Sequence, residues 1–153
     1  MYNWNQFKNI TAITTTRDGG FSTGNFSSAN LAYHVGDNKE TVKKNRDVIF
    51  SKVGINEQNS VFVAQFHSDI TYKVTSKDKG RGFNAFEDGI IADALYTSEK
   101  GINLAVYHAN CVPVFIYVPT HNIVGVIHAG EEGSLKDITG KFIKQLIENN
   151  YER

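Results

Sequence analysis

The chain has 153 residues, about the size of one domain, and 41% of them are hydrophobic while 21% are charged. Sixteen basic and sixteen acidic residues give a formal net charge of zero, so no overall field would collect nucleic acid or anionic lipid. We therefore expect a globular protein that binds neither nucleic acid nor a membrane.

The N-terminus does not resemble an export signal. The first residues lack a basic stretch followed by an apolar run. The longest apolar run, Val112–Pro119, is far shorter than the ~20 residues that cross a bilayer. We expect a cytoplasmic location. The single cysteine, Cys111, cannot form an internal disulfide, which leaves a buried thiol, a metal ligand or a nucleophile.

The first third of the chain predicts one strand and one helix. Residues Ile10–Thr16 alternate and are rich in β-branched side chains, which predicts a strand, and a polar loop follows over 21–36. Asp37 and Glu40 have the spacing of a capping box, and Gly54 is a stop signal. The predicted helix between them repeats apolar residues on one face, at Val42, Ile49, Phe50 and Val53.

The rest of the chain predicts a strand-rich centre and a final helix. Strands are expected at Val61–Phe66, Ile70–Val74, Ile90–Tyr96, Leu104–Tyr107, Val112–Val118 and Ile123–Ile127. The run Val112–Val118 is apolar at nearly every position, which favours a strand covered on both faces. From Ser134 the spacing returns to that of a helix, at Leu135, Ile138, Phe142 and Leu146, although Gly140 inside it costs ~1 kcal/mol. We expect one α+β domain over 1–153.

Three residues with metal-ligand chemistry lie beside predicted strands. His67 ends the run Val61–Phe66, Cys111 follows Leu104–Asn110, and His128 ends the run Ile123–Ile127, so each is expected where a strand gives way to a loop. His, Cys and His are good zinc ligands, and three protein ligands leave the fourth position open, as in catalytic zinc sites. The spacing alone also allows a buried thiol and two histidines that only satisfy backbone groups.

Other candidate binding residues lie in the first third. His34 sits in a polar loop that leads into the predicted helix, and Arg17 and Arg46 are suited to bind an anion because a guanidinium matches phosphate bidentately. Surface or carboxylate-paired arginines remain the alternative. Of the remaining histidines, His121 is expected in a solvated turn and His108 in a strand as a core residue.

Separated blocks of the sequence resemble the laccase-domain, or multicopper polyphenol oxidase, family. The blocks are Thr15-Thr16-Arg17-Asp18-Gly19-Gly20, Ser28-Ala29-Asn30-Leu31, His34-Val35-Gly36-Asp37, Asn45-Arg46, Gln65-Phe66-His67, Ala92-Asp93-Ala94, Cys111-Val112-Pro113 and His128-Ala129-Gly130. Bacterial members of this family are described as purine nucleoside phosphorylases with adenosine deaminase activity. Their fold is an α+β sandwich of mixed sheets covered by helices.

The resemblance implies a zinc site at His67, Cys111 and His128, which would also be the catalytic residues. Arg17, Asn30, His34 and Arg46 are the candidate substrate-binding residues, for a purine nucleoside and phosphate. Zinc is expected rather than copper, because multicopper chemistry needs more than the five histidines present. A homo-oligomer or a complementing polypeptide is left open.

The chain departs from the family pattern in three respects. The family's Ala-Asp-Cys reads Ala109-Asn110-Cys111, so an amide replaces a carboxylate. The family's Trp-Arg after His-Ala-Gly reads Glu131-Glu132, which reverses the charge there. Family members are also longer, so the chain corresponds to the front portion of a shortened family fold.

Three functions follow as hypotheses. The first is a zinc-dependent purine nucleoside phosphorylase acting on adenosine or inosine, with adenosine deamination. The second is a catalytically impaired zinc-binding fragment or partner module, which Asn110, Glu131 and Glu132 favour. The third is a cysteine hydrolase, with Cys111 as the nucleophile and His128 or His67 as the base.

Overall fold

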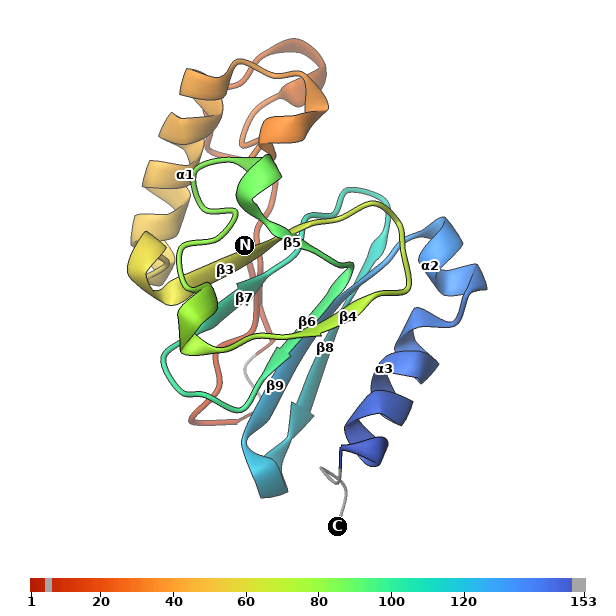
Figure 1. The fold of residues 1–153 in the computed structure, drawn as a ribbon. Helices are drawn as coiled ribbons and strands as arrows, with labels where there is room; N and C mark the ends of the chain where they lie inside the picture. The colour runs from red at the N-terminus through yellow and green to blue at the C-terminus, as the bar shows by residue number, and fades with distance from the viewer. Residues whose placement is uncertain (5–6, 150–153) are drawn as a thin grey trace. The chain divides into compact units, whose positions relative to one another are not determined.

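The computed structural model describes residues 1–4 and 7–149 and divides the chain into two compact units, Met1–Ile55 and Asn56–Arg153 (Figure 1). Both helices and strands are present, so the predicted α+β class is confirmed. The single domain over 1–153 stays a prediction. Among the described residues, no helix combines the length and the apolar character needed to span a bilayer.

The first unit contains a short strand pair and one long helix. Strand β1 (Tyr2–Asn3) pairs antiparallel with β2 (Ile13–Thr14). The strand predicted over Ile10–Thr16 is therefore wrong in length. Its partner β1 is only two residues long, and the Ile10 N–H donates within a turn to the Phe7 carbonyl.

Helix α1 spans Lys39–Val53 and confirms the helix predicted there. Its N-cap is Asn38 and not the predicted Asp37, because the Asn38 side chain accepts the Thr41 N–H at 3.0 Å. Gly54 ends the helix in the left-handed conformation, with φ 72°, and its N–H bonds to the Phe50 carbonyl.

The second unit contains two sheets. The three-stranded sheet has the order β5-β3-β7, with β3 (Ser60–Ala64) parallel to both β5 (Ile90–Ile91) and β7 (Asn103–Ala105). The four-stranded sheet has the order β4-β6-β9-β8, formed by β4 (Thr71–Lys73), β6 (Ala94–Thr97), β9 (Ile123–Ala129) and β8 (Val112–Val118). Short 3-10 turns occur at Gly24–Phe26, Tyr33–Val35, Glu57–Asn59, Ser76–Asp78, Phe86–Asp88 and Pro119–His121.

The strand predicted over Ile90–Tyr96 is wrong as a single element. The chain leaves the three-stranded sheet after β5, passes through Ala92 and Asp93, and enters the four-stranded sheet as β6. The chain makes the same passage from β3 to β4. The other three short strands, β3, β4 and β7, also differ by one or two residues from their predicted bounds.

The core of this unit lies on both sides of the four-stranded sheet. Leu95 of β6 and Val126 of β9 pack in one cluster with residues of β3 and β5 from the other sheet. Ala94 and Ile127, on the opposite face, pack in a second cluster with α3 (Ile138–Glu148). Figure 1 shows α3 lying along this sheet. Two sheets and a helix therefore form three layers.

Strand β8 confirms the strand predicted over Val112–Val118, but the expected cover on both faces is wrong. It is the edge strand of its sheet, and Val112 and Phe115 remain 60% and 38% exposed. Its neighbour β9 extends two residues beyond the predicted Ile123–Ile127. His128 therefore lies within a strand and not after one.

The final helix is divided into two. Helix α2 (Glu131–Leu135) stops before Asp137, which starts α3 as an N-cap by accepting the Gly140 N–H at 3.1 Å. A Cβ at Gly140 would lie 2.2 Å from an Asp137 carboxylate oxygen, so glycine at this position accommodates the cap. Phe142 and Leu146 are buried as predicted, whereas Leu135 is 83% exposed.

Candidate metal centre

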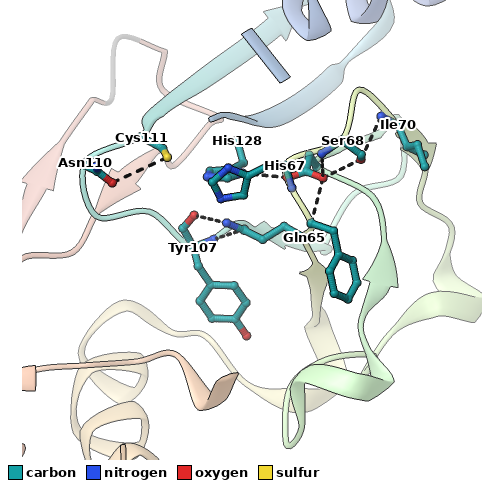
Figure 2. A network of polar contacts seen from close by, with 10 residues as sticks. Gln65, His67, Ser68, Ile70, Tyr107, Asn110, Cys111 and His128 are labelled. Atoms are coloured by element: carbon teal, nitrogen blue, oxygen red, sulfur yellow. Dashed lines mark hydrogen bonds and ion pairs between the residues drawn. The ribbon is translucent and has the colours of Figure 1, made fainter. Parts of the chain in front are cut away.

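His67, Cys111 and His128 come together in the second unit. One ligand atom from each residue lies within 4.8 Å of the other two. His67 follows β3, Cys111 directly precedes β8, and His128 is the second-last residue of β9. Figure 2 shows the three side chains facing one another. Two imidazoles and one thiol form a donor set that suits Zn²⁺.

The alternation of β9 determines where His128 points. Val126 belongs to the cluster between the two sheets, and Ile127 to the cluster beneath α3. Because side chains two residues apart share a face, His128 lies on the same side as Val126. The imidazole is 1% exposed, and its ring centroid lies 4.9 Å from that of His67.

His67 has an unusual main-chain conformation. Its φ of 58° is in the left-handed region, which costs a non-glycine residue roughly 1–2 kcal/mol. The N–H groups of Phe66, His67 and Ser68 all donate to the carboxylate of Asp93, at 3.2, 3.0 and 2.7 Å. These bonds hold the turn in the conformation that presents the exposed His67 ring.

Asp93 is completely buried, at 0% exposure. Besides the three N–H groups, its carboxylate accepts the Ser68 hydroxyl at 2.6 Å and contacts His128 Nδ1 at 2.8 Å. Burial alone would raise the pKa of Asp93, but the hydrogen bonds from His128 and Ser68 outweigh it and hold the pKa below its ordinary value. No role was predicted for Asp93, although it lies in the Ala-Asp-Ala block.

Cys111 is positioned by a link between two loops. The Gln65 side chain donates to the Tyr107 carbonyl at 2.8 Å and accepts the Tyr107 N–H at 2.9 Å (Figure 2). This pair joins the segment after β3, which carries His67, to the segment after β7, which carries Cys111. The Cys111 sulfur lies 3.9 Å from Asn110 Oδ1. Gln65 is a second residue for which no role was predicted, although it starts the Gln-x-His block.

Gly130 lies against both histidine rings. A Cβ at this position would come within 3.0 Å of His128 Cε1 and within 3.0 Å of His67 Nδ1. Such distances are shorter than ordinary van der Waals contact, so a larger residue would displace the rings. The glycine of the His-Ala-Gly block thus has a steric role at the cluster.

One nearby residue, His108, differs in place from what the sequence indicated. His108 is not in a strand and not in the core, because β7 ends at Ala105 and the His108 side chain is exposed. Desolvation and the nearby His128 lower the pKa of His108. Glu131 and Glu132 are exposed in the first turn of α2, where the helix dipole favours acids, and Glu132 pairs with Lys136 at 3.1 Å.

The four candidate substrate-binding residues belong to the first unit. Arg46 is only 2% exposed, and its guanidinium lies 4.8 and 4.9 Å from the ring centroids of Tyr33 and Phe50. Its Nη1 donates to the Leu31 carbonyl at 2.9 Å. Arg46 therefore packs the loop before α1 onto the helix, and a substrate role for it stays a prediction.

The other three candidates also precede α1 in the chain. Asn30 and His34 lie in the loop before the helix, and Arg17 lies ahead of that loop. Asn30 is half-buried and donates to Asp37 at 3.0 Å, so its amide helps to organise the loop. Arg17 is exposed, and its Nε donates to the Ser27 carbonyl at 2.7 Å. His34 is exposed in the turn Tyr33–Val35. Their roles toward a substrate stay predictions.

The fold and the cluster define an α+β protein with a candidate site for a transition metal. The family described as multi-copper polyphenol oxidoreductase laccase matches residues 11–153. The chain belongs to this family, which confirms the resemblance seen in the sequence blocks.

The chain is also similar to named relatives and to a solved structure of this family. The chain is 39% identical over 142 residues to purine nucleoside phosphorylase YlmD of Bacillus subtilis, covering 92% of this chain and 51% of that protein. It is 37% identical to a purine nucleoside phosphorylase of Haemophilus influenzae, with 93% and 54% covered. The crystal structure of hypothetical protein YfiH from Bacillus licheniformis matches with a TM-score of 0.88 and 33% identity, over 93% of this chain and 54% of that one. The chain thus spans about half the length of the curated relatives it matches.

Proposed function

We propose that the chain supplies the metal-binding part of a purine nucleoside phosphorylase. The observation that carries this proposal is the approach of His67, Cys111 and His128 to within 4.8 Å in one cluster. The relatives that share this fold and bear that name support the substrate class. Zinc is the proposed metal, because one thiolate and two imidazoles are ligands it prefers and three ligands leave a position open.

The proposed reaction is phosphorolysis of adenosine or inosine. A phosphate oxygen bonds to the ribose C1′, the bond from C1′ to the purine nitrogen breaks, and that nitrogen takes a proton. When bound, zinc supplies a Lewis acid that stabilises developing negative charge. Adenosine deamination is proposed as a second activity of the same site.

Within this proposal, Arg17 is the better candidate for phosphate than Arg46. Arg17 is exposed, whereas Arg46 is stacked between two rings and 2% exposed. Asn30 and His34 remain proposed substrate residues. A guanidinium binds phosphate through charge and paired N–H donors, and only an accessible one can meet an incoming ligand.

The test measures metal and turnover in the same preparation. Purified chain loaded with zinc is given adenosine or inosine with phosphate, and chromatography follows free base, ribose 1-phosphate and inosine formed from adenosine. We expect one zinc per chain and phosphate-dependent release of base. His67→Ala and Cys111→Ser should lose both, while His121→Ala, in the turn Pro119–His121, serves as the matched control. A chain that never binds zinc would overturn the proposal.

Stoichiometric zinc without turnover would favour the second hypothesis, an impaired zinc-binding module. Asn110 stands beside the ligand Cys111, and an amide does not accept a proton as a carboxylate does. The combined changes Asn110→Asp, Glu131→Trp and Glu132→Arg should then create activity. Failure to gain any would count against the idea that these three positions removed it.

The cysteine hydrolase hypothesis uses the same cluster in another way. Cys111 is the chain's only cysteine, so mass spectrometry reports its alkylation directly. Iodoacetamide should modify Cys111 slowly when zinc is present and rapidly after a chelator removes it. Equal rates in both conditions, together with an acyl-enzyme mass on an ester substrate, would instead support a free nucleophile.

A further inference from the structure

Asp93 lies where the second unit passes from one sheet to the other. It follows β5 of the three-stranded sheet and directly precedes β6 of the four-stranded sheet. The turn that carries His67 makes the same passage between β3 and β4. A carboxylate with no exposed surface at this junction is unusual, because buried acids are rare unless they are paired.

The carboxylate divides its hydrogen bonds between two parts of the metal centre. Oδ2 accepts the N–H groups of Phe66 and Ser68 and the Ser68 hydroxyl. Oδ1 contacts the His67 N–H at 3.0 Å and His128 Nδ1 at 2.8 Å. One oxygen thus touches both histidine ligands, the main chain of one and the ring of the other.

The contact with the His128 ring has a chemical consequence. The Asp93 carboxylate accepts hydrogen bonds from three main-chain N–H groups and the Ser68 hydroxyl, so it also faces His128 Nδ1 as an acceptor, and Nδ1 carries the proton. Nε2 of the neutral ring then holds a lone pair, as a metal ligand requires. The main chain adds a further restraint, because the His128 N–H donates to the Asp93 carbonyl at 2.7 Å.

We propose that Asp93 is a positioning residue for the metal centre. It holds His128 in the Nδ1-protonated tautomer, and it holds the His67 turn in its left-handed conformation, so that both rings face the same ion. This inference rests on the proposed metal site. The alternative is that Asp93 only caps the turn over 66–68 and that its contact with His128 has no effect on metal binding.

The first experiment examines the metal-free wild-type protein. Two-bond ¹H–¹⁵N correlation spectra of the imidazoles distinguish the tautomers, and the spectrum of His128→Gln identifies the His128 signals. We expect His128 to be neutral with the proton on Nδ1. A proton on Nε2 alone would overturn the inference, and this result does not depend on whether any variant folds.

The second experiment compares Asp93→Asn with Ser68→Ala. Asp93→Asn replaces one carboxylate oxygen by an NH₂ group, a donor that would face other donors. Ser68→Ala removes one hydrogen bond between Asp93 and the turn and leaves the contact between Asp93 and His128 intact. Zinc affinity is measured by competition with a chromophoric chelator, and circular dichroism verifies folding. We expect a loss of about 10–100-fold for Asp93→Asn and less than about 3-fold for Ser68→Ala.

The outcomes separate the inference from the proposed function. Equal losses in the two variants would show that Asp93 acts only as a cap of the turn and would overturn the inference. Undiminished affinity in a folded Asp93→Asn protein would also overturn it. If wild-type protein binds no zinc while His128 still carries its proton on Nδ1, the proposed function fails and the tautomer assignment stands.

Discussion

Gln65 and Tyr107 are joined by two hydrogen bonds, from the Gln65 amide to the Tyr107 carbonyl at 2.8 Å and from the Tyr107 N–H to the Gln65 amide oxygen at 2.9 Å. The side chain of one residue thereby takes the place of a strand partner for the main chain of the other. The two residues lie in the segments that lead to His67 and Cys111. We expect this link to restrain the separation of the two proposed ligands.

Replacing Gln65 by alanine should weaken both the fold and the metal site. The main-chain groups of Tyr107 lose their partners, which costs about 1–3 kcal/mol in the free energy of unfolding. Zinc affinity should fall further than this loss explains, because Cys111 is no longer held in place. Urea unfolding by circular dichroism and zinc competition measure the two effects, and the exposed Gln58→Ala is the matched control. Unchanged zinc affinity in Gln65→Ala would refute the link.

Gly130→Ala should impair metal binding more than folding. The added methyl group would lie 3.0 Å from atoms of both His67 and His128, so at least one ring must move. We expect a drop in zinc affinity of at least about 10-fold, in line with other disturbances next to a metal ligand. The control Ser134→Ala, at an exposed position of the same segment, should leave zinc affinity unchanged. Cobalt absorption spectra would show whether the remaining site keeps its coordination.

Arg46→Lys should destabilise the first unit although it preserves the charge. Lysine cannot reproduce the stacking of a planar guanidinium on Tyr33 and Phe50 or its bond to Leu31, and we expect a loss of about 2–4 kcal/mol. Trp4 is the only tryptophan and lies in this unit, so its fluorescence can follow unfolding. Arg17→Lys, at an exposed position, should leave stability unchanged and raise the KM for phosphate. If Arg46→Lys raised the KM for phosphate and Arg17→Lys did not, phosphate binding would be assigned to Arg46.

Asp37 should make the first unit sensitive to acid. Desolvation by itself would raise the pKa of Asp37, but hydrogen bonds from Asn30, Ser22 and the Asn38 N–H lower this pKa below its ordinary value. A carboxyl with a lowered folded-state pKa stabilises the protein above its unfolded pKa, and this contribution is lost as the pH falls through the folded value. Stability should therefore decrease below about pH 4.

The control for this acid sensitivity is Asp37→Asn. The variant should be less stable than the wild type at neutral pH, and the difference should shrink as the solution is acidified. Asp69 and Asp93 also have lowered pKa values, so the comparison of the two proteins, and not the wild-type curve alone, isolates Asp37. A difference that stays constant down to pH 2.5 would contradict the assignment.

The sequence contained enough to single out the three residues that cluster, His67, Cys111 and His128, and most of the strands. His67, Cys111 and His128 stand next to apolar runs that form strands, although these strands belong to two sheets and His128 lies within its strand. The helix α1 was predictable because its apolar face and its final glycine are local signals. These features depend on the order of neighbouring residues, which a single sequence displays.

The remaining features depend on contacts between distant residues. The run Ile90–Tyr96 has the same apolar pattern on both sides of Asp93, so periodicity does not reveal that the chain changes sheets there. Asp93 itself was the available signal, because a charged residue inside an apolar run must find partners. Arg46 was expected to bind an anion, and its place between two aromatic rings depends on tertiary packing that local pattern does not show.

The alternation of β9 also limits how this segment can change in length. Val126 and His128 share one face, and Ile127 lies on the other, beneath α3. Removing or adding one residue between Gly125 and His128 would turn the imidazole toward the helix layer and Ile127 toward the metal ligands. A two-residue change would keep the imidazole on the same face of the sheet. It would, however, move His128 by two residues out of register with Pro113, its partner on β8. Insertions and deletions in this segment are thus expected to abolish the site even where every ligand residue is retained.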